Sequence, residues 1–528
     1  MAELPPAAIL ITGATDGIGL AMARLWAQQG WRQRPARLIL VGRKALADLD
    51  AAFFNADNYC QADLSRPHAP VQIAQWLDAH EIGQLDLLVH NAGVGYVGDT
   101  GAQSATNVRQ LIAVNLEAPL ALTHQLLNRM TPTGKIVFIS SVASALPGPD
   151  YAVYTATKSA LNGFVRNLRI ELAAAPATRT MEVQLILPGA INTGMHAKSG
   201  ATLDRMNWQR FPPADQVAAQ IAAVIEGPRA TATIGGLNRV VRFAGQNLSP
   251  LVDGALRRTQ KRADAAPARL PEAPPHCVIT GAADGIGKAL AQRLAAAGFR
   301  ITGLDFDAER ANQTRQELTA AGGTIEFVQV DLANQDALDA ALQTLRAGPA
   351  VDLLIHNAGI NAVGHFAHME WPLQQMVLAV NLVAPLLLTR GLLAANHLNA
   401  GGTVVCISSL SRFVGYPGAA VYAASKDGLA SYARSLSVAL AGQNINVLTV
   451  YPGPTRTAHA RRYSPDNSRE ARRMAPAELA QRIVAAVEKR QRTLIPGAGN
   501  QLFAVAGHLA PRVTERVMKR AILDKVQG

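Results

Sequence analysis

The sequence predicts two α/β domains in tandem, each built on a doubly wound parallel sheet. Short apolar runs alternate along the chain with longer segments of helical periodicity, and the runs are apolar throughout rather than at every second residue. Such runs are typical of parallel strands that are covered on both faces. Alternating strands and helices then require right-handed crossovers. The whole pattern occurs twice, which indicates two copies of one domain.

The repeat is clearest in its short motifs. Residues 12–19 read TGATDGIG and residues 280–287 read TGAADGIG, about half of the 528 residues apart. Behind each copy follow NAG at 91–93 and 357–359, YxxxK at 154–158 and 422–426, and PGxxxT at 188–193 and 452–457. Solenoid repeats recur every 20–50 residues. A period this long therefore indicates a duplicated domain.

In the first copy we expect strands at 8–12, 38–41, 85–90, 135–140 and 182–187, with a helix at 17–29 after the glycine-rich turn. The most apolar stretch, 377–395, approaches the length of a membrane span, but it contains Asn381, Pro385 and Arg390 and has a counterpart at 111–127. We interpret it as a buried core helix.

We expect a first domain at 1–250, a basic tail with an Ala/Pro-rich linker at 251–275, and a second domain at 276–528 that ends in a basic helix. The tails run through Arg262 and Lys525. A basic amphipathic helix can lie on a membrane, pack on a partner subunit or cover an active site. Peripheral membrane contact is not the alternative that we favour.

The composition is that of a globular protein and gives no support for a nucleic-acid-binding, disulfide-bonded or metal-binding one. The chain is 49% hydrophobic and 17% charged, with a net charge of +12. A basic chain can attract anions, but no zinc-finger or RNP-type motif supports nucleic-acid binding. Cys60, Cys277 and Cys406 occupy unmatched positions without CxxC spacing, so we expect neither disulfides nor a metal site. With no secretory pattern at the N-terminus, we expect a cytoplasmic protein.

The glycine-rich turn is a predicted dinucleotide site. Glycines allow a tight turn and close approach of a ligand, and the following helix N-terminus favours a pyrophosphate. The candidate cofactor-binding residues are Gly13, Thr15, Asp16, Gly17, Ile18 and Gly19 in the first copy and Gly281, Asp284, Gly285, Ile286 and Gly287 in the second.

The end of the second strand distinguishes the copies. A carboxylate there binds the ribose hydroxyls of NAD, whereas an arginine accepts the 2′-phosphate of NADP. Alignment of the copies places Gly42 opposite Asp305 and Arg43 opposite Phe306. We therefore expect NADP in the first domain and NAD in the second. A five-residue insertion around 32–36 could shift Arg43.

One further pair of residues is a candidate at the cofactor. Asp63 and Asp331 stand where an acidic side chain could bind the adenine amino group.

A tyrosine and a lysine share a helix face in both copies, because residues i and i+4 are neighbours on a helix. The pairs are Tyr154 with Lys158 and Tyr422 with Lys426. A nearby ammonium lowers the pKa of a phenol and makes it a useful acid or base. Ser141 and Ser409 each precede the tyrosine by thirteen residues, and Asn115 and Asn381 each lie in an apolar helix.

In this order of motifs the chain resembles two fused members of the short-chain dehydrogenase/reductase family, whose domains are Rossmann-like. The resemblance implies that the tyrosine exchanges a proton with the substrate oxygen, to which the serine hydrogen-bonds. It implies that the lysine binds the nicotinamide ribose and that the asparagine holds a relay water. It also implies that Thr193 and Thr457 bind the carboxamide. Asn91 and Asn357, in NAG motifs with Gly93 and Gly359, would support the sheet beneath the cofactor.

The segment after the PGxxxT motif covers the substrate in this family, and the two copies differ there. The second is rich in arginine, with His459, Arg461, Arg462, Tyr463, Arg469, Arg472 and Arg473. The first has Met195, His196, Lys198, Arg205, Met206, Trp208, Arg210 and Phe211. An arginine-rich cover can bind a carboxylate or phosphate, or can be a solvated helix face.

These observations predict a bifunctional NAD(P)-dependent oxidoreductase acting on alcohols and ketones. The apolar residues of the first cover favour hydrophobic substrates there. The alternative is one catalytic domain with a structural partner domain, because relatives pair through the helices that carry the asparagine and the Tyr-Lys pair. Fusion would supply the two paired domains within one chain. Whether two such chains also form a homodimer is left open by the sequence. A nucleotide-binding protein without catalysis, or an epimerase with a larger substrate domain, fits the motifs less well.

Overall fold

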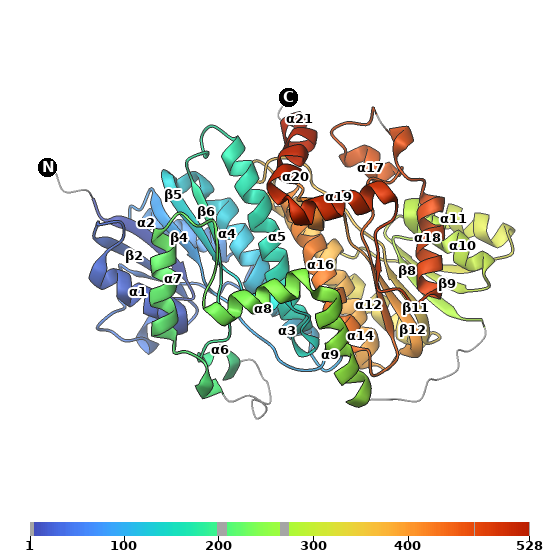
Figure 1. Ribbon diagram of the computed structural model, residues 1–528, viewed down its shortest axis with the longest axis horizontal. Helices are drawn as coiled ribbons and strands as arrows, with labels where there is room; N and C mark the ends of the chain where they lie inside the picture. The colour runs from blue at the N-terminus through green and yellow to red at the C-terminus, as the bar shows by residue number, and fades with distance from the viewer. Residues whose placement is uncertain (1–4, 198–207, 264–273, 469, 527–528) are drawn as a thin grey trace. The chain divides into compact units, whose positions relative to one another are not determined.

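The computed structural model describes residues 5–197, 208–263, 274–468 and 470–526. The chain forms two compact units. Unit 1 comprises Met1–Gly98, Thr106–Leu146 and Val153–Ser249, and unit 2 comprises Asp99–Ala105, Pro147–Ala152 and Pro250–Gly528. Each unit holds one seven-stranded parallel sheet between helices (Figure 1). The predicted fold class, two Rossmann-like domains in tandem, is confirmed. The predicted domain boundaries stay a prediction.

The two sheets have the same strand order. In unit 1 it is β3-β2-β1-β4-β5-β6-β7, and in unit 2 it is β10-β9-β8-β11-β12-β13-β14. The strands of unit 1 are β1 (Ala7–Thr12), β2 (Ala36–Gly42), β3 (Tyr59–Gln61), β4 (Leu85–His90), β5 (Met130–Ile139), β6 (Glu182–Leu187) and β7 (Thr231–Thr233). Those of unit 2 are β8 (His276–Thr280), β9 (Arg300–Asp305), β10 (Thr324–Gln329), β11 (Val351–His356), β12 (Leu398–Ile407), β13 (Asn446–Val450) and β14 (Thr493–Leu494).

Helices connect the strands and cover both faces of each sheet. The main helices from the first half of the sequence are α1 (Gly17–Gln29), α2 (Ala69–Ala79), α3 (Ala105–Ile112), α4 (Ala118–Leu126), α5 (Ala152–Ala174), α6 (Gly194–Ala197), α7 (Ala214–Glu226), α8 (Gly236–Asn247) and α9 (Ser249–Ala263). Those from the second half are α10 (Gly285–Ala296), α11 (Ala308–Ala320), α12 (Gln335–Ala347), α13 (Trp371–Leu378), α14 (Ala384–Ala394), α15 (Ser411–Val414), α16 (Ala420–Ala439), α17 (Ala458–Tyr463), α18 (Pro476–Glu488), α19 (Ala498–Leu509), α20 (Pro511–Met518) and α21 (Asp524–Val526).

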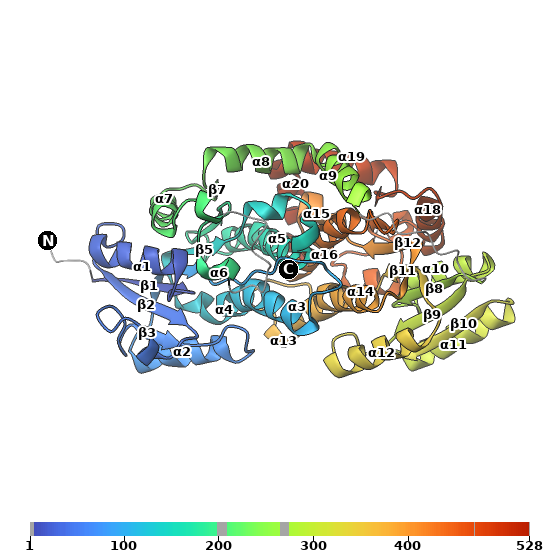
Figure 2. The same ribbon diagram turned by 90° about the horizontal axis from the view of Figure 1, so that it is seen from below.

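The core of each unit lies between the sheet and two helices that pack together. In unit 1, Met22 and Trp26 of α1 and Ile221 of α7 are buried against Ile9 and Ile11 of β1. In unit 2, α10 and α18 pack in the same way over β8 and β11. Figure 2 shows α7 on one side of the first sheet and α2 and α4 on the other. Both faces of the strands are therefore buried, as their continuous apolar runs predict.

Strand order fixes where a ligand can bind. In both units the first strand is where the order of the strands reverses. Strands β2 and β3 are added on one side of β1 and β4 on the other, and likewise β9 and β11 lie on opposite sides of β8. Ligands of open parallel sheets bind outside the carboxyl ends of the strands at such a switch point. The glycine-rich turns after β1 and β8 lie there.

The sheet register tests the alignment of the two copies. Thr12 pairs with Val41 in unit 1, and Thr280 pairs with Leu304 in unit 2. Gly42 and Asp305 therefore occupy the same position. The insertion before β2 is absorbed by a tight turn, in which Arg32 and Gln33 have φ values of 50° and 60° and Trp31 bridges to Arg34. It does not shift Arg43.

The apolar stretch 377–395 is a core helix of unit 2. Trp371–Ala394 is long and apolar enough to cross a membrane, but 72% of its most apolar window is buried in the protein. The tails are helical as predicted, in α9 and in α20 to α21. Contact of these tails with a membrane stays untested.

Candidate active sites

The glycine-rich turn joins β1 to α1 and β8 to α10. Gly13 and Gly281 have φ values of 67° and 66°, a region that side chains rarely adopt. A Cβ on Gly19 or on Gly287 would overlap the carbonyl oxygen of Gly13 or Gly281. Asp16 and Asp284 cap the helices by accepting hydrogen bonds from Gly17 and Gly285 N at 2.7 and 2.6 Å. The turns are cradles of the kind that admits a pyrophosphate against the helix N-terminus.

The NAG motifs brace these turns from below. Asn91 Nδ2 donates to the carbonyl oxygens of Thr12 and Gly13 at 3.0 and 3.2 Å. Asn357 Nδ2 does the same to Thr280 and Gly281 at 3.1 and 2.9 Å. The supporting geometry that the resemblance implies is present in both units.

The ribose position differs between the units in two residues at once. In unit 2, Asp305 Oδ2 accepts a hydrogen bond from Ala283 N at 2.9 Å, so the carboxylate is held against the glycine-rich turn. In unit 1 a Cβ on Gly42 would lie 2.5 Å from Thr15 Cγ2. Thr15 occupies the sequence position of Ala283, so its side chain fills the place of the carboxylate.

The charges at this position differ accordingly. Burial raises the pKa of Asp305 above its ordinary value, although hydrogen bonds from Ala283, Asp307 and Phe306 N oppose the shift. In unit 1 the exposed Arg43 follows Gly42. Unit 1 therefore presents a cation one residue after the position at which unit 2 presents a carboxylate.

Asp63 and Asp331 lie in the turns that follow β3 and β10. Asp63 Oδ1 accepts hydrogen bonds from Ser65 N and Oγ at 3.0 and 2.8 Å, and Asp331 Oδ1 accepts one from Ala333 N at 2.9 Å. Burial acts to raise the pKa of Asp63, but the Ser65 hydrogen bonds and the charges of Arg66 and Arg43 hold it below its ordinary value. Both side chains are thus held in place by hydrogen bonds within their own turns.

The asparagines lie in π-helical turns, at Ala113–Glu117 and Ala379–Val383. Asn115 Oδ1 accepts from Val94 N and Nδ2 donates to Val94 O, both at 2.9 Å. Asn381 makes the same pair of bonds with Ile360, again at 2.9 Å. π turns insert one extra residue and occur frequently at functional sites. Here each turn aims a buried amide at the loop after the fourth strand of its sheet.

Each tyrosine faces its lysine. Lys158 Nζ lies 5.9 Å from the ring centroid of Tyr154, and Lys426 Nζ lies 5.8 Å from that of Tyr422. Each ammonium donates to a strand carbonyl, Ile139 O or Ile407 O, at 3.0 Å. The lysines are thus held at the carboxyl edge of the sheet.

The serines stand at the same edge. Ser141 and Ser409 follow β5 and β12 and accept hydrogen bonds from Ala143 N and Ser411 N at 3.1 and 3.2 Å. In unit 2 a side-chain hydrogen bond links Ser409 to Tyr422. Serine, tyrosine and lysine therefore converge on one point in that unit.

Glycines leave room between the asparagine and the lysine. A Cβ on Gly93 would lie 3.4 Å from Asn115 Oδ1 and 3.6 Å from Lys158 Nζ. On Gly359 it would lie 3.3 Å from Asn381 Oδ1 and 3.2 Å from Lys426 Nζ. A side chain there would separate the two polar groups.

Burial shifts the pKa values of the two lysines and of Tyr422. It lowers the pKa of Lys158 and of Lys426 to about 8. It raises the pKa of Tyr422 to about 12, with a further increase from Tyr416 and an opposing hydrogen bond from Ser409. Perturbed lysine and tyrosine pKa values in one cleft are typical of an active site.

The PGxxxT threonines reach the glycine-rich turns. A Cβ on Gly17 would lie 3.4 Å from Thr193 Cγ2, and one on Gly285 would lie 3.3 Å from Thr457 Cγ2. Thr457 also caps α17 by accepting a hydrogen bond from Ala460 N at 3.1 Å. The threonines thus lie next to the predicted nucleotide site.

The predicted cover of unit 2 is held by polar contacts. Arg461 pairs with Glu470 at 2.8 Å, and Arg462 lies over the Tyr463 ring at 5.4 Å. Lys198, Arg205, Met206 and Arg469 lie outside the described residues.

Two residues beside Tyr422 were not predicted from the sequence. The ring of Tyr416 meets that of Tyr422 edge-on at 5.8 Å, with an interplanar angle of 81°. The Tyr416 hydroxyl is hydrogen-bonded to the buried side chain of Asn361. Comparison of the two copies could have found Tyr416, because the sixth residue before the first catalytic tyrosine is Gly148.

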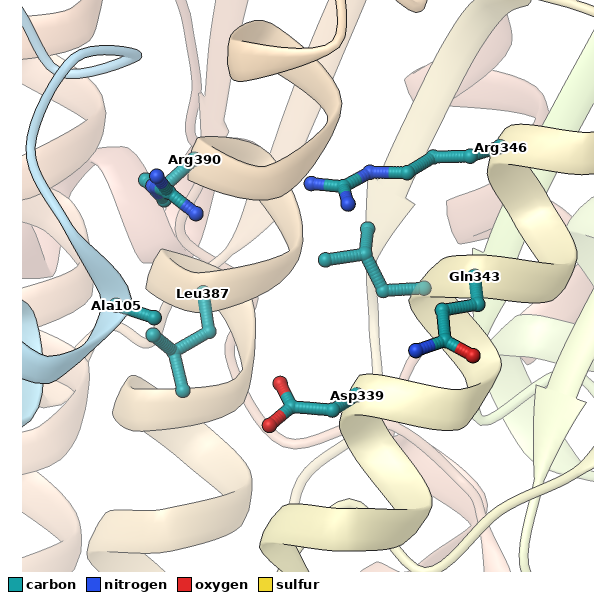
Figure 3. Close-up of a pocket in the computed structure, with 7 residues that line it drawn as sticks. Ala105, Asp339, Gln343, Arg346, Leu387 and Arg390 are labelled. Carbon is teal, nitrogen blue, oxygen red and sulfur yellow. The ribbon is translucent and has the colours of Figure 1, made fainter.

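A separate groove in unit 2 has a volume of about 250 Å³ (Figure 3). Asp339, Gln343 and Arg346 of α12 face Leu387 and Arg390 of α14 across it. No predicted site residue lines it. Because Arg346 and Arg390 donate to the backbone oxygens of Gly391 and Gln103, we assign it no ligand.

Comparison with known proteins places this geometry in context. A family model described as short chain dehydrogenase matches residues 7–204 and again 275–468. Nodulation protein G of Rhizobium meliloti is 35% identical over 177 residues, which cover 33% of this chain and 71% of that protein. The 2-(R)-hydroxypropyl-CoM dehydrogenase of Xanthobacter autotrophicus is 33% identical over 186 residues, which cover 34% and 74%. A solved short-chain dehydrogenase from Sphingobium yanoikuyae in complex with NADPH is 26% identical, covers 46% of this chain and 96% of its own, and has a TM-score of 0.40.

Proposed function

Because this chain belongs to the short-chain dehydrogenase family, as a tandem fusion of two of its NAD(P)-dependent domains, we propose that it is a bifunctional oxidoreductase. Each unit would interconvert a secondary alcohol and a ketone. The observation that carries the proposal is the recurrence of the same polar set in both units. Asparagine, serine, tyrosine and lysine lie at the carboxyl edge of each sheet beside an intact glycine cradle.

When bound, a nicotinamide cofactor donates or accepts the hydride. The chain's own residues handle the proton. During reduction the Tyr154 or Tyr422 hydroxyl donates a proton to the carbonyl oxygen. During oxidation the phenolate accepts the proton of the alcohol hydroxyl. The ammonium of Lys158 or Lys426 stabilises that phenolate.

Other side chains orient the reacting groups. Ser141 or Ser409 would donate a hydrogen bond to the substrate oxygen. The amide of Asn115 or Asn381 is fixed by the backbone and faces the lysine across the space left by Gly93 or Gly359. A water held there would return protons to the lysine. Thr193 and Thr457 would bind the carboxamide of the cofactor.

We propose further that the units prefer different cofactors, NADP in unit 1 and NAD in unit 2. A fixed carboxylate at Asp305 can accept hydrogen bonds from both ribose hydroxyls and repels a 2′-phosphate. In unit 1 Thr15 fills that place and Arg43 offers a cation. The paired difference Thr15 with Gly42 against Ala283 with Asp305 supports this assignment.

Calorimetric titration of the full chain tests the number of sites. We expect two nucleotides per chain, one site tighter for NADP+ and one tighter for NAD+, together with oxidation of secondary alcohols in a panel assayed with each cofactor. One nucleotide per chain would instead support a single catalytic domain with a structural partner.

A further inference from the structure

We propose that the second site takes a substrate bearing a carboxylate, an oxo acid or the corresponding hydroxy acid, and that Arg473 binds this carboxylate. The inference rests on the proposed function, because the substrate's carbonyl or carbinol carbon would react at Tyr422. It adds the chemical class of the substrate and one recognition residue.

Arg473 holds a donor without a partner. Its Nη2 donates to Ser464 Oγ and to the carbonyl oxygen of Asp466, both at 2.9 Å, which fixes the guanidinium plane. Its Nη1 is buried and has no hydrogen-bond partner among the residues that the structure describes. Buried polar groups in proteins are hydrogen-bonded with few exceptions, and the exceptions often mark functional groups. A ligand acceptor would satisfy Nη1.

The charge of Arg473 is also uncompensated within the described chain. The three acidic residues nearest in sequence are paired elsewhere, since Glu470 pairs with Arg461, Glu478 with Arg482 and Asp466 with Lys525. Arg462 lies over Tyr463, and Arg472 is exposed. Of the described arginines in this segment, Arg473 therefore combines a fixed guanidinium, a buried free donor and no acidic partner.

Tyr416 connects Arg473 to the reacting group. Met474, the residue after Arg473, accepts a hydrogen bond from Arg456 N beside Thr457, so Arg473 lies next to the PGxxxT loop. The charge of Arg473 also opposes the increase in the pKa of Tyr416 that burial causes. The same Tyr416 ring meets Tyr422 at 5.8 Å. We expect a substrate with its carbonyl oxygen at Tyr422 to extend past Tyr416 toward Arg473.

Unit 1 has a different residue at the matched place. Asn192 N donates to Pro212 O in unit 1, and Arg456 N donates to Met474 O in unit 2, each at the residue before the PGxxxT threonine. Pro212 therefore corresponds to Met474, and Phe211 corresponds to Arg473. Because phenylalanine cannot pair with an anion, carboxylate recognition is assigned to unit 2 alone.

A carboxylate fits better than a phosphate. One fixed guanidinium, with a single free buried nitrogen, balances one negative charge, whereas a phosphate monoester carries close to two. Charge-assisted hydrogen bonds contribute about 1.5–3 kcal/mol, equivalent to roughly a tenfold to hundredfold change in affinity.

The test uses the full chain with Tyr154→Phe, which removes the reaction at the first site, saturated with NADH. Non-reacting probes are pentanoate, pentanamide and propyl phosphate, and binding is measured by calorimetry. We expect pentanoate to bind about tenfold or more tightly than either of the other probes. Arg473→Gln should remove most of this preference, Arg473→Lys should keep part of it, and the exposed-site control Arg472→Gln should leave it unchanged.

The parallel kinetic experiment compares 4-oxopentanoate with its methyl ester. The value of kcat/KM should favour the acid, and Arg473→Gln should lower kcat/KM for the acid and not for the ester. The inference would be overturned if the chain with an unchanged Arg473 bound pentanoate and pentanamide equally tightly. It would also be overturned if that chain bound propyl phosphate more tightly than pentanoate. Even then, the proposed function would stand if the parent chain reduced both ketones and Tyr422→Phe abolished that reduction.

Discussion

At Gly42 and Asp305 the two units differ by a carboxylate, and the proposed difference in nucleotide preference rests on it. Asp305 is held by Ala283 N at 2.9 Å, and the equivalent space in unit 1 is taken by Thr15. A fixed carboxylate repels the dianionic 2′-phosphate of NADP and accepts hydrogen bonds from the hydroxyls of NAD. The proposed cofactor preference thus rests on two residues per unit.

Asp305→Asn keeps the size of the side chain and removes its charge. We expect affinity of the second site for NAD+ to fall about tenfold and affinity for NADP+ to rise by a similar factor. Dissociation constants from calorimetry measure both. Asp307→Asn, which alters the cap of α11, serves as the control, and an unchanged NAD+ to NADP+ ratio in Asp305→Asn would refute this role of Asp305.

The pKa values of Tyr422 and Lys426 predict a pH profile for the second site. Oxidation needs the phenolate, and burial raises the pKa of Tyr422 to about 12 in the free protein, so the phenolate fraction grows about tenfold per pH unit across neutrality. Lys426, with a pKa of about 8, loses its charge above that pH. For alcohol oxidation in a Tyr154→Phe background, kcat/KM should therefore rise from pH 6 and level off near pH 8. A flat profile over this range would contradict the assignment of Tyr422 as the base.

At the scale of elements, the strand–turn–helix units after β1 and β8 depend on the absence of side chains. A Cβ on Gly287 would overlap the carbonyl oxygen of Gly281, so an alanine there must displace the turn. The same holds for Gly19 and Gly13. Sequence, local geometry and nucleotide binding are therefore linked at these positions.

Gly287→Ala should weaken nucleotide binding in unit 2 by at least about tenfold and leave unit 1 intact. Calorimetry would then detect one tight nucleotide per chain in place of two. Gly499→Ala is the matched control, since nothing lies within 4 Å of a Cβ at that position of α19. Two tight sites in Gly287→Ala would show that the cradle does not bind the nucleotide.

Much of this architecture could be predicted from periodicity and turn residues. The structure has α1, β4 and β6 at the predicted residues, because their apolar patterns end at glycine, proline or polar residues. β3 and β7 were not predicted, since three residues carry too little pattern. The π turns around Asn115 and Asn381 were also missed, because one extra residue in a helical turn leaves the surrounding apolar sequence unchanged.

The candidate site was predictable where its residues belong to repeated motifs. The Tyr-Lys pairs follow from helical spacing, and the bracing asparagines follow the fourth strand of each sheet. Tyr416 belongs to no motif and stands out only when the two copies are compared. Arg473 also belongs to no motif, and its influence on Tyr416 becomes visible only in the folded chain. The contact between Thr15 and Gly42 likewise depends on the packing of two loops that are distant in sequence.

At the scale of the whole molecule, the duplication has kept the proposed proton-transfer groups and changed the recognition groups. Both units hold the lysine and the asparagine by the same hydrogen bonds, with distances that agree within 0.1 Å. They differ at the ribose position and at Phe211 against Arg473. This pattern is expected if both sites work on different substrates, with different nucleotides, in one chain.

The most direct test is to replace each catalytic tyrosine alone and to follow both cofactors. We predict that Tyr154→Phe abolishes the NADP(H)-dependent activity and spares the NAD(H)-dependent one, and that Tyr422→Phe does the reverse. Nucleotide binding should be retained in both variants, because the phenol oxygen contributes to proton transfer and not to the cradle. Loss of both activities in one variant, with the other unaffected, would contradict the account of two working sites.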